Sequence, residues 1–200
     1  MSDTSTAPAA LQIDPVTGAL AGATGRYDKR MRDLAGLYQD RDAYARAAQH
    51  DPDRLMYRVH EHRREERPGD LIFGTSVLEP GTVGREYAMT RGHLHEIADR
   101  TEIYSCLRGH GILLMEHVDG RVHAAEMRPG TVVYVGPHWI HRSVNVGAET
   151  LVTLFCYPGD SGQDYGIIER SGGMRSLIVT DGNGGWAQVD NPGYRPRNHP

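Results

Sequence analysis

The sequence predicts an all-β protein, built as a sandwich or a closed jelly-roll barrel, with a short helical segment near the N-terminus. Its 200 residues suit a single domain. The 24 Gly, 11 Pro and 10 Tyr, against only 2 Phe, describe a turn-rich chain. Such a composition suits many short strands better than long helices. Short apolar or alternating runs also follow one another at regular spacing without helices among them, which favours a sandwich or barrel over a parallel sheet.

The helical segment is expected over residues 40–49. Asp40 can cap its N-terminus, four alanines favour the helical backbone, and Pro52 limits its continuation. Runs of strand length then follow at 55–59, 71–78, 86–90, 102–107, 112–117, 122–127, 131–135 and 151–157.

Turn residues separate these runs. The Asp119-Gly120 pair is typical of a β-hairpin. The runs 176–180 and 186–189 predict a terminal hairpin that could pair with the N-terminal strand. The charged run 61–67 is interpreted as a solvated strand end or turn.

The domain organisation predicted from composition is simple. Residues 15–193 form a single domain, between a flexible N-terminal tail over 1–14 and a C-terminal tail over 194–200.

Composition also restricts the partners. A net charge of -4 and an isoelectric point near 6.2 argue against a nucleic-acid partner, because phosphate backbones need a concentrated basic face. No apolar run is long enough to span a bilayer, and the N-terminal residues do not resemble a signal peptide. We therefore expect a cytoplasmic protein with a small-molecule partner. In that compartment the two cysteines are expected to be buried thiols, not a disulfide.

Four residues form the most specific pattern in the chain. His93 and His95 project from the same face if the segment is extended, an adjacent strand could return Glu102 to the same height, and His141 lies on a late strand. A lone histidine is usually an ordinary surface or hydrogen-bonded residue, but this joint spacing predicts a metal site. Nitrogen and oxygen ligands suit a divalent transition metal such as Fe, Mn, Ni, Co or Zn, with positions left for substrate. His138 could lie next to the metal ligands and help to orient them.

These residues resemble the cupin signature, which is matched in large part by His93, His95, Glu102, Gly109, Gly130, Gly136-Pro137, His141 and Asn145. A closer resemblance, from about residue 11 to 193, is to the cupin-type phosphoglucose isomerases known from archaea, and it is carried by the segments 89–95, 102–104, 129–135, 139–145 and 157–166.

The resemblance implies a cupin double-stranded β-helix that interconverts glucose 6-phosphate and fructose 6-phosphate. It implies one divalent metal per subunit, held by the three histidines and Glu102, and a homodimer. Glu102 would also be the catalytic base, and Tyr104 and Tyr165 would orient substrate hydroxyls.

The phosphate has no P-loop to bind it, and no cluster of Lys or Arg flanks the motifs, so neutral donors are expected. By resemblance these are the hydroxyls of Ser76, Thr90 and Tyr157 and the backbone amide of Gly92. Gln163 departs from the family, which usually has His there, and a glutamine cannot titrate near neutral pH.

Two other functions compete with the isomerase. An Fe(II) dioxygenase of the cupin family would use the same three His and one Glu ligands, with oxygen as co-substrate. A non-catalytic sugar-binding cupin would use the metal only to order the barrel. Oxygen consumption separates the first alternative from an isomerase.

Overall fold

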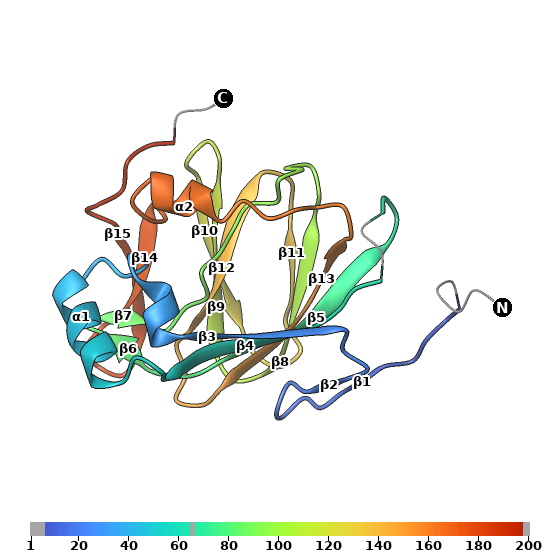
Figure 1. The fold of residues 1–200 in the computed structure, drawn as a ribbon. Coiled ribbons are helices and arrows are strands. Elements are labelled where there is room, and N and C mark those ends of the chain that lie inside the picture. The colour runs from blue at the N-terminus through green and yellow to red at the C-terminus, as the bar shows by residue number, and fades with distance from the viewer. Residues whose placement is uncertain (1–6, 65–66, 198–200) are drawn as a thin grey trace.

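The computed structural model describes residues 7–64 and 67–197, which form a β-barrel flanked by short helices (Figure 1). Every strand pair in this part of the chain is antiparallel. The predicted all-β barrel is therefore confirmed. One wall is a six-stranded sheet of β11 (Val132–Val135), β8 (Glu102–Arg108), β13 (Leu151–Pro158), β5 (Leu71–Leu78), β4 (Leu55–His62) and β3 (Gly25–Arg30), in that order.

Two smaller sheets form the other wall. The first has the order β10 (Val122–Met127), β9 (Gly111–His117) and β12 (Trp139–Asn145), and the second has the order β15 (Trp186–Asp190), β14 (Ser176–Thr180), β7 (Glu86–Tyr87) and β6 (Thr82–Val83). A backbone bridge joins Met89, which follows β7, to Val144 on the edge strand β12, and so connects the two sheets.

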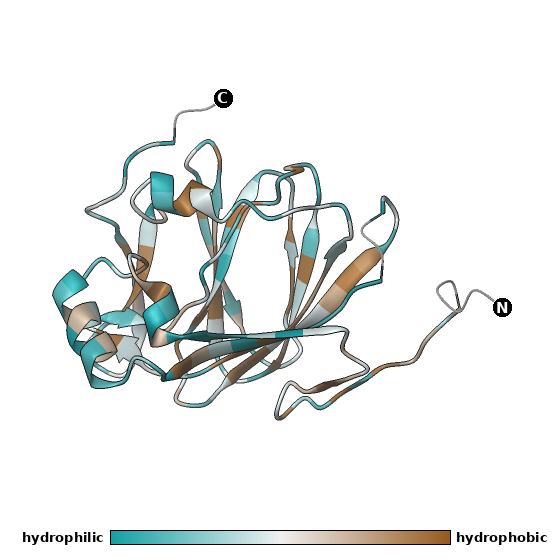
Figure 2. Cartoon of the chain, viewed as in Figure 1, coloured by the Kyte–Doolittle hydropathy of each residue, from teal (hydrophilic) through white to brown (hydrophobic). Residues whose placement is uncertain are grey.

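The core lies between these walls, and Figure 2 shows hydrophobic residues concentrated along the strands. Met56 and Ile72 from one wall and Ile112 and Ile140 from the other belong to the same buried cluster. On β8 the alternation of side chains places Glu102, Tyr104 and Cys106 inside and Ile103 outside. Strand alternation thus brings the Glu102 carboxylate into the barrel interior.

Helix α1 (Arg41–His50) confirms the predicted helical segment. The carboxylate of Asp40 accepts a hydrogen bond from the backbone N–H of Ala43 at 2.8 Å, as an N-cap should. A 3-10 helix (Met31–Leu34) precedes it, and α2 (Gly166–Arg170) follows β13. No helix within the described residues is both long and apolar enough to cross a membrane. Cys106 and Cys156 are free thiols, and Cys106 is the buried one.

Both chain ends make contacts outside the predicted limits of the domain. Gln12 and Ile13 form β1 (Gln12–Ile13), which pairs with β2 (Leu20–Ala21). At the other end Tyr194 and Arg197 bind the buried carboxylate of Glu116, so the chain is packed on the barrel as far as residue 197. Residues 1–6 and 198–200 of the two predicted tails lie outside the described part. Limits of 15 and 193 for a single domain stay a prediction.

The terminal hairpin exists, but its partner differs from the expected one. β14 pairs with β15 through five register positions from Ser176 to Thr180, as predicted. Its other neighbour is β7, where Val179 faces Glu86, and not an N-terminal strand. The N-terminal strand β3 instead extends the six-stranded sheet beside β4. The N-terminal strand β3 therefore lies beside the cavity inside the barrel.

Candidate metal centre and active site

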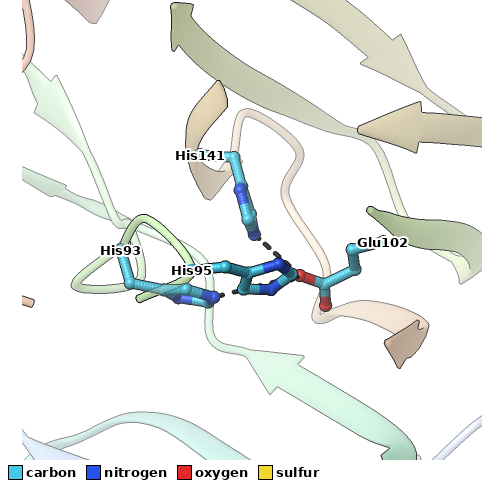
Figure 3. A group of neighbouring side chains, drawn as sticks. All are labelled: His93, His95, Glu102 and His141. Carbon is cyan, nitrogen blue, oxygen red and sulfur yellow. Dashed lines mark hydrogen bonds and ion pairs between the residues drawn. The ribbon is translucent and has the colours of Figure 1, made fainter. Parts of the chain in front are cut away.

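The four predicted ligands meet inside the barrel, although they come from three separate segments (Figure 3). Glu102 begins β8 and His141 lies on β12. His93 and His95 lie on an extended segment between strands, not within a regular strand as expected. His93 forms two backbone hydrogen bonds with His141, of 3.1 and 3.0 Å, and this bridge brings the two histidines side by side.

Gly92 permits that close approach. Its φ of +75° is a conformation that side-chain-bearing residues rarely adopt. A Cβ atom there would lie 2.8 Å from the carbonyl oxygen of His141. Only glycine at this position lets the His93 segment lie against β12.

The side chains converge on one carboxylate oxygen. The Oε2 atom of Glu102 lies 2.9 Å from Nε2 of His141, 3.2 Å from Nε2 of His95 and 3.9 Å from Nε2 of His93. All four potential ligand atoms lie within 4.8 Å of one another, and all four residues are buried. Three nitrogens and one oxygen at this spacing form a group that one metal ion could contact at once.

Backbone carbonyl groups fix the tautomers of two of the imidazoles. Nδ1 of His95 lies 2.9 Å from the carbonyl oxygen of Arg100, and Nδ1 of His141 lies 3.1 Å from that of Trp139. A carbonyl only accepts, so each Nδ1 carries a hydrogen, and a neutral ring then presents a lone pair at Nε2. Those lone pairs point at the Glu102 carboxylate. A proton or a cation between these atoms is needed to make the arrangement favourable.

His93 adds a third nitrogen with no alternative partner. Its Nε2 atom is buried and has no hydrogen-bond partner among the described residues. An unpaired polar atom in the interior normally costs free energy, and one metal ion would satisfy it together with the other three ligands. The donor set therefore fits a transition metal. His138 does not support the ligands as expected, because its ring faces Asp99 at 3.1 Å and is partly exposed.

Charges in the cluster follow from burial and proximity. Burial alone raises the pKa of the Glu102 carboxyl, but His141 and His95 outweigh it and hold that pKa well below its ordinary range. Burial lowers the pKa of His93, and the neighbouring His141 lowers it further. Burial also lowers the pKa of His95, yet the hydrogen bond and charge of Glu102 leave it raised. Glu102 is thus an ionised carboxylate at neutral pH.

Three residues of the cluster, His93, Glu102 and His141, line a polar cavity. This cavity contains every residue predicted for catalysis or phosphate binding: Ser76, Thr90, Gly92, Glu102, Tyr104, Tyr157 and Tyr165. The Oγ atom of Ser76 is buried without a hydrogen-bond partner, while Oγ1 of Thr90 accepts from the N–H of Ser143 at 3.1 Å.

Three tyrosines surround the imidazoles. Ring centroids lie 5.6 Å apart for Tyr104 and His141, 5.5 Å for Tyr157 and His95, and 5.6 Å for Tyr165 and His93. Burial and the adjacent Glu102 raise the pKa of Tyr104 well above its usual value, so its hydroxyl keeps its proton.

Sequence reasoning missed several residues of the cavity wall. Tyr27 of β3, Tyr57 of β4, Glu61, Arg63 and Arg91 all line it. The charged run 61–67 contains the end of β4 at His62, as predicted for a strand end, but Glu61 and Arg63 also line the cavity, and residues 65–66 lie outside the described part. Neutral donors alone are predicted for the phosphate because no cluster of Lys or Arg flanks the motifs, whereas Arg63 and Arg91 also line the cavity. Arg91 directly precedes Gly92 and could have been noticed, whereas the β3 and β4 residues reach the cavity only through sheet pairing.

Comparisons with known proteins agree with this architecture. A family model described as glucose-6-phosphate isomerase (GPI) matches residues 28–195. The chain belongs to this family. A protein of Sinorhizobium medicae named glucose-6-phosphate isomerase is 55% identical over 95% of this chain and 89% of its own. Another of that name, from Thermococcus gammatolerans, is 45% identical over 92% of this chain and 95% of its own.

Proposed function

We propose that the protein is a metal-dependent aldose-ketose isomerase that interconverts glucose 6-phosphate and fructose 6-phosphate. One observation carries the proposal. In a member of the glucose-6-phosphate isomerase family, an ionised Glu102 converges with three imidazoles, and Glu102, His93 and His141 line a hydroxyl-rich cavity. Such a site can bring a base and a positive charge to the same carbon–oxygen unit of a bound sugar.

His93, His95 and His141 would hold one divalent transition metal per subunit through ring nitrogens, with Glu102 as the fourth ligand. Fe, Mn, Ni, Co and Zn all suit this donor set. When bound, the ion supplies Lewis-acid stabilisation of negative charge on a substrate oxygen. The carbonyls of Arg100 and Trp139 keep two of the imidazoles in the ligating tautomer.

Glu102 is the proposed base. It removes the proton from C2 of the open-chain aldose, which leaves negative charge on O1 of an enediolate. The hydroxyl proton of O2 then moves to O1, and return of the first proton to C1 yields the ketose. The depressed pKa keeps Glu102 unprotonated before this step. Tyr104 forms a hydrogen bond with Glu102, and with Tyr165 it orients the sugar hydroxyls. A positioned base of this kind contributes roughly 10² to 10⁴ in rate.

Phosphate binding is assigned to the hydroxyls of Ser76, Thr90 and Tyr157 and to the amide of Gly92. The unpaired, buried Oγ of Ser76 supports this assignment, because a phosphate oxygen would satisfy it. Arg91 lines the same cavity and adds positive charge. The family membership does not favour the dioxygenase or a non-catalytic sugar-binding role, since its relatives are named as isomerases.

The test is an anaerobic assay with fructose 6-phosphate on protein of measured metal content. We expect glucose 6-phosphate to accumulate without oxygen. Turnover that requires oxygen would contradict the isomerase and indicate the dioxygenase. Metal-loaded protein that binds the sugar phosphate without turnover would indicate the non-catalytic sugar-binding protein.

The enzyme is also proposed to be a cytoplasmic homodimer. Its phosphorylated substrate is charged and does not cross membranes unaided, which supports the cytoplasm. Strand β11 ends the six-stranded sheet and exposes Val132 and Tyr134 by 63% and 64%. An exposed apolar edge strand is a natural surface for a second copy of the chain. Light scattering should give about twice the 22.1 kDa of one chain, and the single-chain mass would reject the dimer.

A further inference from the structure

Gln163 connects two tyrosines that line the cavity. Its Nε2 atom lies 3.3 Å from the hydroxyl oxygen of Tyr157 on β13, and its Oε1 atom accepts a hydrogen bond from the hydroxyl of Tyr165. Backbone bonds of 3.2 and 2.8 Å between Leu94 and Asp164 fix the loop that carries Gln163. The amide is therefore held between the tyrosines by the same segment that carries the metal ligands.

The bridge has a direction because an amide differs at its two ends. The nitrogen only donates and the oxygen only accepts. Tyr165 uses its one proton on Oε1, so its oxygen can only accept, and it already has a hydrogen bond with the Tyr27 side chain. Tyr157 receives a hydrogen from Nε2, so its own proton stays available to a group in the cavity. The two hydroxyls thus become chemically different, although both belong to tyrosines.

Both rings also pack on the proposed metal ligands. The Tyr157 ring lies 5.5 Å from that of His95, and the Tyr165 ring lies 5.6 Å from that of His93. Rotation of either tyrosine is thus restricted on one side by an imidazole and on the other by Gln163. The hydroxyls have defined positions as well as defined proton directions.

We propose that Gln163 is a positioning residue that makes the Tyr157 hydroxyl the donor for an acceptor-only anion and keeps the Tyr165 hydroxyl from donating into the cavity. The inference rests on the proposed isomerase function and deepens it. A dianionic phosphate has no proton to donate, so it matches Tyr157 and not Tyr165. Gln163 therefore contributes to the preference for a phosphorylated sugar and to its orientation.

Substitutions that alter the donor but not the size test this role. Gln163→Glu offers only acceptors, so the Tyr157 proton turns toward the new carboxylate. We expect the KM for fructose 6-phosphate to rise roughly tenfold or more, as for a lost hydrogen bond to a charged group, with a smaller change in kcat. Gln163→His retains one donor and one acceptor, and it should stay within about threefold of the parent KM. Gln188→Glu, an equal charge change on the exposed strand β15, is the matched control.

A double-mutant cycle separates hydrogen-bond direction from simple charge repulsion. If Gln163 acts through the Tyr157 hydroxyl, Gln163→Glu should raise KM much less in a Tyr157→Phe background. The same rise in both backgrounds, or a rise as large in Gln163→His as in Gln163→Glu, would overturn the inference. Calorimetric dissociation constants for inorganic phosphate give the same cycle without turnover. A wild type that binds phosphate but does not isomerise would therefore refute the enzyme assignment separately.

Discussion

Glu102 on β8 and Glu116 on β9 are both buried carboxylates, 2% and 0% exposed, but their partners differ in kind. Glu116 is fully paired by the chain itself. Arg197 donates from Nε and Nη2 at 3.0 and 3.1 Å, the Tyr194 hydroxyl donates at 2.8 Å, and the N–H of Arg175 donates at 2.8 Å. Glu102 instead faces imidazoles whose nitrogens have lone pairs to offer.

The difference separates a structural carboxylate from a chemical one. Around Glu116 the donors are permanent, because a guanidinium is charged at any physiological pH. Around Glu102 the neighbouring nitrogens offer lone pairs, which a cation would satisfy, and Nε2 of His93 has no hydrogen-bond partner among the described residues. Two glutamates of equal burial therefore predict opposite responses to substitution. Changes near Glu102 should affect metal and turnover, and changes near Glu116 should affect folding stability.

The largest expected effect is the removal of a ligand. His95→Ala and His141→Ala should each lose the bound metal and with it essentially all turnover, because only three of the four donors then remain to hold the ion. Elemental analysis of the purified, folded variants measures this directly. Full metal occupancy in either variant would show that the substituted histidine is not a metal ligand.

Glu102→Gln makes the next largest change. It preserves size and one oxygen ligand but cannot accept the C2 proton. Turnover per bound metal should fall by roughly 10² to 10⁴, while the free energy of unfolding of metal-free protein stays near the parent value. Exchange of the C2 proton into deuterated water measures the same step. An exchange rate close to that of the parent would show that Glu102 is not the base. The base would then be Tyr104, Tyr165 or a metal-bound hydroxide.

Arg197→Ala tests the other carboxylate. Loss of the guanidinium leaves Glu116 buried without its charge partner, which should destabilise the fold by about 3–5 kcal/mol. Arg195→Ala is the matched control, since that side chain is exposed and should change stability by no more than about 0.5 kcal/mol. Urea unfolding of both variants gives the comparison. Equal midpoints would mean that the Glu116 pair contributes nothing to the fold.

Tyr157→Phe is expected to have the smallest effect of the series. It removes one donor to the phosphate and leaves the ring packed on His95. KM should rise roughly tenfold with metal content unchanged. A loss of metal in this variant would show that the phosphate site and the metal site are not separable.

The fold was predictable where local pattern decides it. β5 and β10 have the predicted bounds, because turn residues limit each run on both sides. Strand β12 was not recognised as a full strand, since the buried Arg142 and Ser143 interrupt its apolar pattern. Arg142 is tolerated there because it donates to the carbonyl of Arg91 at 2.9 Å, a contact between distant segments.

The candidate site was predictable for a different reason. Metal ligands must be His, Cys, Asp or Glu, so their spacing alone singled out His93, His95, Glu102 and His141. Arg197 carries no such signature, and its partner Glu116 lies 81 positions away. The same holds for Gln163, whose bridging role depends on the positions of two tyrosine hydroxyls. Residue type reveals chemistry, but pairing across the barrel emerges only from the fold.

Metal removal and return tests the central claim most directly. Protein treated with a chelator under anaerobic conditions should lose its fructose 6-phosphate isomerisation, and one equivalent of a divalent transition metal per chain should restore it. Glu102→Gln treated in the same way should regain its metal but not the rate. Metal-free protein that isomerises at the original rate would contradict the account, because the three imidazoles and Glu102 would then have no cation to hold.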